Sequence, residues 1–199
     1  MNSGITVAIP TIPPRPAVLM EAIGSAWMNT VKPVGFSIAL DSEGEGAATT
    51  RNRALMGVNS PWVAFLDDDD LMMTDHLEKL KRHAEETGAD FVYSWFYAEG
   101  FKDPFPESHY LNEFDPENPI ETTITTLVRT ELAKEVQFQP IPERQFNGGE
   151  DYNFVLNCIK AGAKISHLVD RTWIYRNHGF NTSGLARNWM GAYPNYQSK

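Results

Sequence analysis

The stretch Trp62-Val63-Ala64-Phe65-Leu66-Asp67-Asp68-Asp69-Asp70 decides the fold class of this chain. Its apolar first half has the length and composition of a short buried strand. The aspartates follow directly, at the point where such a strand leaves the core. In an open α/β sheet, ligands bind beyond the carboxyl ends of the strands. The stretch therefore predicts a buried strand that carries a cluster of carboxylates to a ligand site.

Adjacent carboxylates repel one another unless water or a cation compensates their charge. Oxygen-only ligands of this kind suit Mg²⁺ or Mn²⁺, and a divalent ion that bridges to a diphosphate is a common arrangement. The alternative is a solvated acidic turn that merely ends a strand. Acidic runs taken alone are usually of that kind, so the aspartates by themselves leave both interpretations open.

Strand and helix signals alternate along the rest of the chain, which predicts an α/β domain with a mostly parallel sheet flanked by helices. Strands are expected at 5–9, 36–40, 62–66, 91–96, 122–128, 164–168 and 172–175, helices at 17–28, 47–56 and 150–161, and long loops at 99–119 and 137–148. The clearest helix has Thr74 as its N-cap and Gly88 at its end. Two histidines of this helix, His76 and His83, are expected to face solvent.

Length and composition restrict the class of protein. The 199 residues fit one domain with a substantial core. The net charge of -9 argues against non-specific binding to nucleic acid, which depends on Lys and Arg. No apolar run approaches the roughly 18 to 20 residues that span a bilayer. A single cysteine, Cys158, excludes an internal disulfide and fits a cytoplasmic location; its helical apolar context predicts a buried thiol.

Two polar features follow the second expected strand. Asp41 ends that strand, and its carboxylate could accept a hydrogen bond from a nucleobase or a ribose; a turn-forming aspartate before Ser42 is an equally good interpretation. Arg51 and Arg53 lie in a run of small residues that becomes helical. Small residues permit close approach of a ligand, so one arginine could point at a diphosphate. A solvated helix face is the alternative for each.

Two further features lie in the second half of the chain. Two glycines at 148–149 precede Glu150 and Asp151, which open a helix. Carboxylates there could simply interact with the helix dipole, or one could act as a general base for an acceptor hydroxyl. His178 follows the last expected strand and could be a nitrogen ligand to the same ion, although a lone histidine is more often structural.

The order of these segments carries a family resemblance. The segments are Val7-Ala8-Ile9-Pro10-Thr11, Ala39-Leu40-Asp41, Thr50-Arg51-Asn52-Arg53-Ala54-Leu55, Phe65-Leu66-Asp67-Asp68-Asp69-Asp70 and Gly149-Glu150-Asp151-Tyr152. Taken together they resemble a nucleotide-sugar-dependent glycosyltransferase of the GT-A type, closest in pattern to glycosyltransferase family 2. The resemblance implies a Rossmann-like GT-A catalytic domain over residues 1–180 and a tail, 181–199, that packs on or near the active site.

The resemblance also implies roles in binding the donor. Thr11 and Asp41 would line the pocket for the nucleobase and ribose, and Arg51 would lie near the base or the diphosphate. Arg15 would reach the diphosphate, and Asp68 belongs to the same donor-binding set. A UDP-sugar is the default donor, whereas the acceptor is not identified. The loop after Asp41 is more acidic and glycine-rich than is usual in the family, which weakens the assignment of the base pocket.

Metal binding and catalysis are implied in the same way. Asp69 resembles the last aspartate of the D-x-D motif and would ligate Mn²⁺ or Mg²⁺, with Asp67 on the ribose or the metal and His178 as a further ligand. Asp151 resembles the catalytic base, and Glu150 is the alternative. These roles would produce sugar transfer with inversion. The rival hypotheses are a nucleotidyltransferase and a non-catalytic module that binds a divalent cation or a carbohydrate.

Overall fold

The strands of this chain form a single sheet. The structure, a computed structural model, describes residues 4–100, 102–103, 105–119, 124–139 and 149–176. The strands are β1 (Ile5–Thr11), β2 (Gly35–Leu40), β3 (Trp62–Phe65), β4 (Leu71–Met72), β5 (Phe91–Glu99), β6 (Thr126–Arg129) and β7 (Ile165–Arg176). They are ordered β2-β1-β3-β6-β5-β7-β4 across the sheet.

The sheet is mostly parallel, as the sequence predicts. Strand β1 pairs in parallel with β2 and with β3, and β5 pairs in parallel with β7. Strand β6 lies antiparallel between β3 and β5, and β4 is antiparallel to β7. Only β4 and β6 therefore run against the common direction among the described strands. The expected α/β fold class is confirmed.

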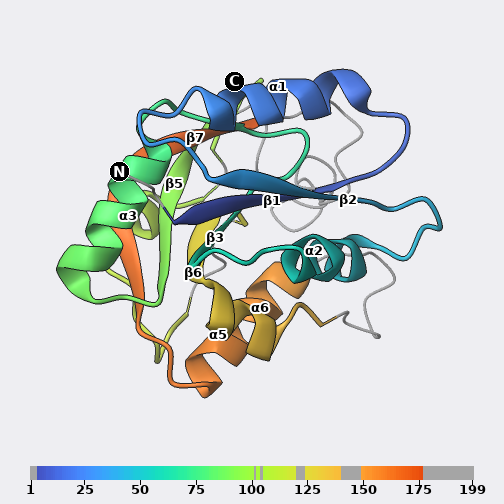
Figure 1. Cartoon of the computed structure of the whole chain (residues 1–199). Coiled ribbons are helices and arrows are strands. Elements are labelled where there is room, and N and C mark those ends of the chain that lie inside the picture. Colours follow the sequence, from blue (N-terminus) through green and yellow to red (C-terminus); the bar gives the residue numbers. More distant parts are fainter. Residues whose placement is uncertain (1–3, 101, 104, 120–123, 140–148, 177–199) are drawn as a thin grey trace, which may run out of the picture.

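Helices cover both faces of the sheet (Figure 1). They are α1 (Pro16–Trp27), α2 (Ala47–Met56), α3 (His76–Thr87), α4 (Glu107–Leu111), α5 (Thr130–Val136) and α6 (Glu150–Lys160). Helices α1 and α3 share one apolar cluster with Val7 of β1. Helices α2, α5 and α6 share the other with Ala8, because adjacent side chains of a strand point to opposite faces. No helix in the described part of the chain is long and apolar enough to cross a membrane.

The parallel strands bring separate parts of the sequence to one edge of the sheet. Strands β1, β2 and β3 run in the same direction, so their carboxyl ends lie together. The backbone N–H of Asp41 donates to Thr11 O at 2.8 Å, which places the end of β2 beside the end of β1. The range 67–70 follows β3 at the same edge. The chain topology therefore gathers the residues that the sequence singles out.

Several expected elements differ from the observed ones. The two strands expected at 164–168 and 172–175 are one strand, β7, whose pairing with β5 shifts register near Trp95. Helix α5 was not expected, since its seven residues are too few to show an apolar period. Helix α4 lies inside the expected long loop at 99–119. Strand β6 begins at Thr126 rather than 122, and residues 120–123 lie outside the described part.

The prediction that His76 faces solvent is wrong. Its side chain is fully buried, and its Nδ1 lies 2.6 Å from Thr172 Oγ1 of β7. Burial lowers the pKa of His76 to about 3, because the charged imidazolium would lose its hydration. His83 is half-buried, with its Nε2 2.8 Å from Ser166 Oγ. Both histidines therefore tie α3 to the sheet.

Candidate active site

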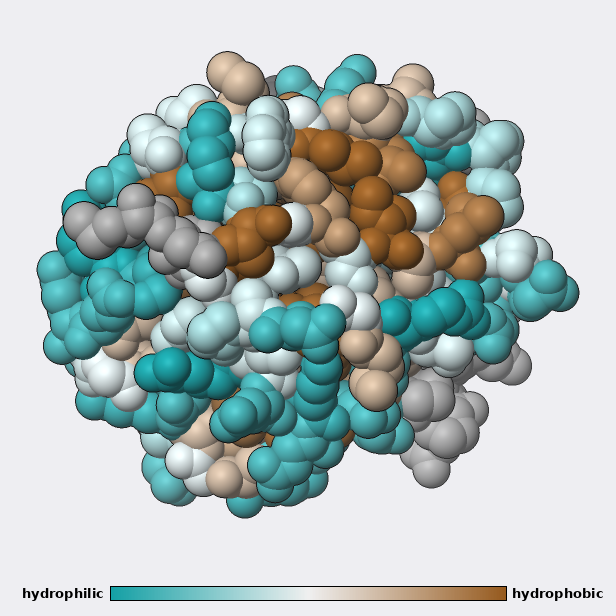
Figure 2. All heavy atoms as spheres, in the orientation of Figure 1, coloured by the Kyte–Doolittle hydropathy of each residue, from teal (hydrophilic) through white to brown (hydrophobic). Residues whose placement is uncertain are grey.

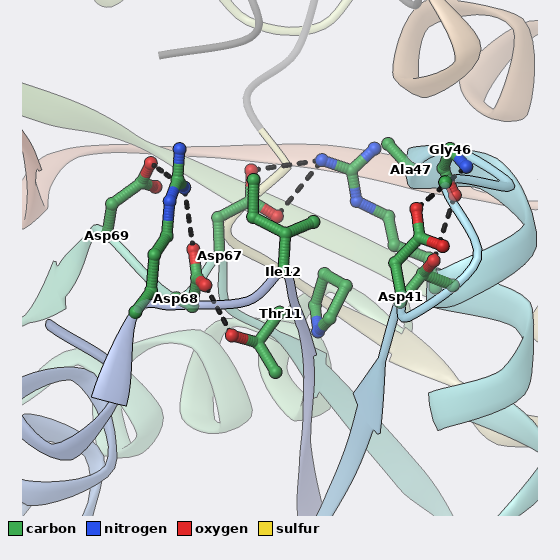
Figure 3. A pocket seen from close by; sticks show the side chains of 13 residues that line it. Thr11, Ile12, Asp41, Gly46, Ala47, Asp67, Asp68 and Asp69 are labelled. Carbon is green, nitrogen blue, oxygen red and sulfur yellow. Dashed lines mark hydrogen bonds and ion pairs between the residues drawn. The ribbon is translucent and has the colours of Figure 1, made fainter. Parts of the chain in front are cut away.

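A pocket opens where β1, β2 and β3 end (Figure 3). It is lined by Pro10, Thr11, Ile12, Arg15, Asp41, Gly44, Gly46, Ala47, Thr50, Arg51, Asp67, Asp68 and Asp69. The carboxylates of 67–69 lie on one side of this pocket and Asp41 lies on the other. Every donor-site residue expected from the sequence thus lines one cavity.

Residues 67–70, which follow β3, are called the acidic turn here. Arg15 compensates its charge on one side. Its Nη1 donates to Asp68 Oδ1 at 3.2 Å and to Asp69 Oδ2 at 3.0 Å. The hydroxyl of Thr11 donates to Asp68 Oδ2 at 2.5 Å. Asp68 is therefore turned toward β1 and the loop that follows it, where it fixes the wall of the pocket.

Arg51 joins the acidic turn to the start of α6. Its Nη2 donates to both carboxylate oxygens of Asp67, at 3.0 and 2.9 Å, and its Nη1 donates to Glu150 at 2.5 Å. Burial alone would lower the pKa of Arg51, but the nearby Asp67, Glu150 and Asp151 raise it above its ordinary value. A fixed cation thus lies between residues that are 16 and 99 positions away in the sequence.

Asp70 is a member of the acidic cluster that sequence reasoning did not assign to the site. It is 1% exposed, and it accepts the backbone N–H of Arg176 at 3.1 Å. Burial and the neighbouring Asp69 and Asp67 raise its pKa well above the ordinary value, although the Arg176 contacts lower it in part. Its position as the last of the aspartates was the only available signal.

The acidic cluster fits a divalent cation. One carboxylate oxygen each of Asp67, Asp69 and Asp70 lies within 4.8 Å of the others. Oxygen-only donors of this number suit Mg²⁺ or Mn²⁺, which keep waters and substrate phosphates as their remaining ligands. Burial first, and then the neighbouring Asp69 and Asp67, raise the pKa of Asp70, and a bound cation would offset the negative charge of this cluster. The expected ligand His178 lies outside the described residues.

Asp41 shapes the loop that follows β2. Its Oδ1 accepts the N–H of Glu45 at 2.8 Å and its Oδ2 accepts the N–H of Gly46 at 2.9 Å. Burial would raise its pKa, but the backbone N–H groups of Gly46, Glu45 and Gly44 lower it. The turn-forming interpretation of Asp41 is therefore correct. The same carboxylate lines the pocket, and its remaining lone pairs are available to a ligand.

The two acidic residues at the start of α6 have different surroundings. Glu150 is buried and bound to Arg51. Asp151 is half-buried, and its Oδ1 accepts the N–H of Tyr152 at 2.8 Å. Gly149 precedes them with φ 89°, a conformation that favours glycine. This left-handed turn starts the helix and directs both carboxylates to its first turn.

Comparison with known proteins identifies the family of this chain and a relative that it matches over part of its length. The profile of Glycosyl transferase family 2 matches residues 21–142, which is more than half of the chain. An uncharacterized glycosyltransferase of Methanocaldococcus jannaschii is 23% identical over 145 residues, covering 66% of this chain and 47% of that protein. The chain therefore spans about half the length of this curated relative.

Solved structures of TarS from S. aureus have the same fold. The complex of TarS residues 1–349 with UDP-GlcNAc has a TM-score of 0.74 at 17% identity, covering 92% of this chain and 61% of that one. The complex with UDP has a TM-score of 0.68 at 18% identity, covering 89% and 61%. These likenesses concern the fold, whereas the family rests on the matched sequence: the chain belongs to glycosyltransferase family 2.

Proposed function

We propose that this chain transfers a sugar from a nucleotide diphosphate sugar to an acceptor hydroxyl with inversion at the anomeric carbon. The observation that carries the proposal is the pocket in which Arg51 links the acidic turn to the start of α6. This link would hold the proposed donor site and the proposed general base at one edge of the sheet. The TarS structures contain UDP-GlcNAc and UDP, which makes a UDP-sugar the first donor to test.

The donor would lie along the carboxyl ends of β1 and β2. Thr11 and Asp41 would face the nucleobase and ribose, and Arg15 and Arg51 would face the diphosphate. Both arginines are paired with carboxylates of the acidic turn. A diphosphate with its cation adds charges of both signs, so these arginines can exchange carboxylate partners for phosphate oxygens. Asp68 would keep the wall of the pocket in place.

A divalent cation would be held by Asp69 and Asp67, with Asp70 beside them and His178 as a fourth group. Bound there, Mn²⁺ or Mg²⁺ would act as a Lewis acid that offsets the charge developing on the leaving diphosphate. The chain's own task is to fix the carboxylate oxygens, which it does through the hydrogen bonds from Arg15, Arg51 and the backbone of Arg176.

Asp151 is the proposed general base. The carboxylate of Glu150 is already bound to the Arg51 guanidinium, which holds it away from an acceptor. Asp151 lies next to it on the first turn of α6 and is half-buried. Asp151 would take the proton of the acceptor hydroxyl. At the same time the hydroxyl oxygen would attack the anomeric carbon, and the bond from that carbon to the diphosphate would break. Glu150 would position the helix.

The first experiment is a calorimetric titration with UDP, GDP and dTDP, each with Mn²⁺ and with a chelator. We expect UDP to bind and the chelator to weaken its binding. Failure of every nucleotide to bind in the presence of Mn²⁺ would overturn the donor-site proposal. Binding of GDP or dTDP in place of UDP would change the proposed nucleobase of the donor but keep the donor site.

The base assignment is tested with a matched pair of variants. We expect Asp151→Asn to lower transfer by about 10²–10⁴-fold, the usual contribution of a positioned base, with unchanged UDP binding. Glu150→Gln should retain far more activity. The reverse result would make Glu150 the general base.

Asp69→Ala should remove the metal dependence of UDP binding, and unchanged metal dependence would contradict the proposed role of Asp69 as a metal ligand.

The remaining expectations stay predictions. Residues 181–199, expected on or near the active site, lie outside the described part of the chain. A cytoplasmic location is likewise a proposal, which fractionation of the producing cells would test.

A further inference from the structure

Arg15 holds two neighbouring carboxylates of the acidic turn with one nitrogen, Nη1 (Figure 3). This nitrogen lies 3.2 Å from Asp68 Oδ1 and 3.0 Å from Asp69 Oδ2. The side chains of Arg15 and Asp69 are 16% and 12% exposed, so water screens the contact between them only in part. Asp69 also belongs to the cluster that fits a divalent cation. Arg15 therefore binds a carboxylate that the cation would need as a ligand.

The two arginines of the pocket are bound to the acidic turn in different ways. Arg51 donates to both carboxylate oxygens of Asp67 from one nitrogen and to Glu150 from the other. Arg15 makes one contact with Asp68 and one with Asp69 through Nη1. A carboxylate that is held by both of its oxygens is bound more tightly than one that is held by a single oxygen. Asp69 is therefore easier to release from its arginine than Asp67.

The backbone of Arg15 is fixed, whereas its side chain faces the pocket. Arg15 is the residue directly before α1, and its carbonyl oxygen accepts the N–H of Leu19 at 3.1 Å. Pro16 follows at the first position of the helix, where its ring fixes the backbone. The side chain of Arg15 lines the pocket. Rotation about its side-chain bonds can turn the guanidinium from the acidic turn toward a ligand without moving α1.

Helix α1 offers Arg15 no alternative partner of negative charge. The one charged residue of this helix, Glu21, is paired with Arg176. Apolar side chains such as Met20 and Trp27 are exposed instead, and Figure 2 shows apolar residues gathered on the face where α1 and β2 lie in Figure 1. Such side chains are poor hydrogen-bond acceptors. A guanidinium that leaves the acidic turn would therefore find its acceptors in the pocket.

We propose that Arg15 couples the binding of the cation to the binding of the donor diphosphate. In the ligand-free chain, the Arg15 guanidinium competes with a divalent cation for Asp69, because two positive charges at one carboxylate repel each other. A diphosphate supplies anionic oxygens whose geometry suits a guanidinium as well as a carboxylate does. By turning to the diphosphate, Arg15 leaves Asp69 to the cation. This inference deepens the proposed function and rests on it.

Coupling between two ligands acts in both directions. Arg15 would weaken the binding of Mn²⁺ until a diphosphate is present, and the bond between Arg15 and Asp69 would weaken the binding of a diphosphate until a cation is present. Direct contact between a cation and a phosphate also couples the two ligands, with no help from an arginine. The part that belongs to Arg15 is distinguished in the nucleotide-free chain, where removal of the guanidinium should strengthen the binding of Mn²⁺.

A purely structural role for Arg15 predicts the opposite sign. If Arg15 only kept the acidic turn in shape, its removal would let Asp69 move and would weaken the binding of Mn²⁺ with and without nucleotide. The direction of the change in the nucleotide-free chain therefore separates the two roles.

Calorimetric titration of the full chain with Mn²⁺, without nucleotide, tests the proposal. We expect Arg15→Gln to lower the dissociation constant of Mn²⁺ by about 5–150-fold, the usual range of coupling between two ligands. With Mn²⁺ at saturation, the same variant should bind UDP about 10–100-fold more weakly, because it loses a charged hydrogen bond to the diphosphate. One substitution should thus change the two affinities in opposite directions.

The matched control is Arg53→Gln. It removes the same charge from an arginine that is 43% exposed and paired with Glu45. The dissociation constant of Mn²⁺ should be unchanged in this variant. An equal gain of affinity in Arg15→Gln and Arg53→Gln would overturn the proposal, because the gain would then follow from net charge alone.

A second variant and a second readout support the titration. Arg15→Met keeps the apolar part of the side chain and replaces Arg15→Gln if that variant does not fold. In either variant, Mn²⁺ alone should raise the Tm by more than it does in wild type, because tighter binding to the folded chain adds more stability.

The outcomes distinguish this inference from the proposed function. Unchanged or weaker binding of Mn²⁺ in the nucleotide-free Arg15 variants, with UDP still bound by wild type, would overturn the coupling role alone. If wild type binds no UDP in the presence of Mn²⁺, the proposed function fails and the coupling role fails with it.

Discussion

Arg51 is the residue on which the geometry of the pocket depends. Its guanidinium lies between Asp67 and Glu150, with a side chain that is 7% exposed. We expect Arg51→Met to lower the free energy of unfolding by about 3–5 kcal/mol, because it leaves two carboxylates without a cation. Arg51→Lys should cost less, since it keeps the charge but loses the fork that binds two oxygens of Asp67. Urea unfolding measures both.

Arg53 provides the control on the same helix. Its side chain is 43% exposed and is paired with Glu45. An exposed pair contributes about 0–1 kcal/mol, so Arg53→Met should have a small effect. Adding Glu150→Gln to Arg51→Met should restore part of the lost stability. Equal losses for Arg51→Met and Arg53→Met would contradict the picture of a buried cation that holds α6 against the acidic turn.

Asp70 should affect stability and metal binding in opposite directions. Without a metal, burial and the neighbouring Asp69 and Asp67 disfavour the charged form of Asp70. Asp70→Asn keeps an oxygen that accepts the Arg176 N–H and removes the charge. We expect the metal-free chain to gain roughly 1 kcal/mol, or about 2–4 °C in Tm. Affinity for Mn²⁺ should fall by about 10–100-fold. Calorimetry and thermal unfolding measure the two effects.

The matched control for Asp70 is Asp90, which also accepts a backbone N–H at 3.1 Å, from Lys164. Its side chain is 42% exposed and is not part of the cluster of Asp67, Asp69 and Asp70. Asp90→Asn should leave Mn²⁺ affinity unchanged. A lower Tm for metal-free Asp70→Asn would contradict the prediction that burial and repulsion make the Asp70 carboxylate unfavourable.

His76 should make the fold sensitive to acid. Its pKa is about 3 in the folded chain, compared with about 6.5 when unfolded. The unfolded chain therefore takes up a proton at this site as the pH falls below 6.5, while the folded chain does not. The resulting loss of stability approaches about 1.4 kcal/mol per pH unit and continues toward pH 3.

The measurement is the free energy of unfolding at several pH values between about 7 and 4.5, in wild type and His76→Asn. The variant cannot take up this proton, so its stability should fall less steeply. His83→Asn is the control, because His83 is half-buried and its pKa is lowered by burial to a lesser degree. Equal slopes in wild type and His76→Asn would contradict the prediction.

At the scale of elements, substitution of alanine for glycine should have opposite effects on stability at two positions. Gly88 ends α3 with φ 68°, and a Cβ there would meet nothing within 4 Å. Gly88→Ala should therefore cost about 1–2 kcal/mol from backbone strain alone. Gly24 lies inside α1 with the same open space. Gly24→Ala should stabilise the chain by about 0.5–1 kcal/mol, because alanine is the better helix former. Thermal unfolding of both variants decides it.

The elements that could be predicted are those whose local signals agree. Helix α2 has the predicted limits, 47–56, and α3 ends at the glycine that the sequence indicates. Strand β7 was split in the prediction because Asp170 and Arg171 interrupt its apolar pattern. In the sheet, a register shift beside Trp95 absorbs the extra residues, which is a tertiary effect with no local signal.

The same distinction holds for the site. Residues 67–69 could be predicted as site residues because they follow a strand directly. The link from Arg51 to Glu150 could not, since it joins positions 99 apart and depends on how α2 and α6 pack on the sheet. The burial of His76 was missed because its neighbours in sequence, on α3, are mostly polar, whereas its partner Thr172 lies on β7.

At the scale of the whole molecule, elements on both faces of the sheet support the edge that carries the candidate site. Arg176 of β7, which bonds to α1, and Arg51 of α2 each hold the acidic turn. Arg176 donates to Glu21 of α1 and, through its backbone, to Asp70. Arg51 of α2 holds the turn from the other face. Ligand binding at this edge should therefore stabilise the whole chain rather than one loop.

Thermal unfolding with ligands tests this coupling. Binding to the folded chain alone adds about 2.7 kcal/mol at a ligand concentration 100 times the dissociation constant. For a chain of 199 residues this corresponds to a rise in Tm of roughly 5–11 °C. We expect UDP with Mn²⁺ to produce it, Mn²⁺ alone to produce less, and UDP with a chelator to produce little. Asp69 accepts from Arg15 and belongs to the acidic cluster that would hold the cation. Asp69→Ala should therefore abolish the part of the Tm rise that depends on Mn²⁺. A rise that persists in this variant would place the cation elsewhere on the chain.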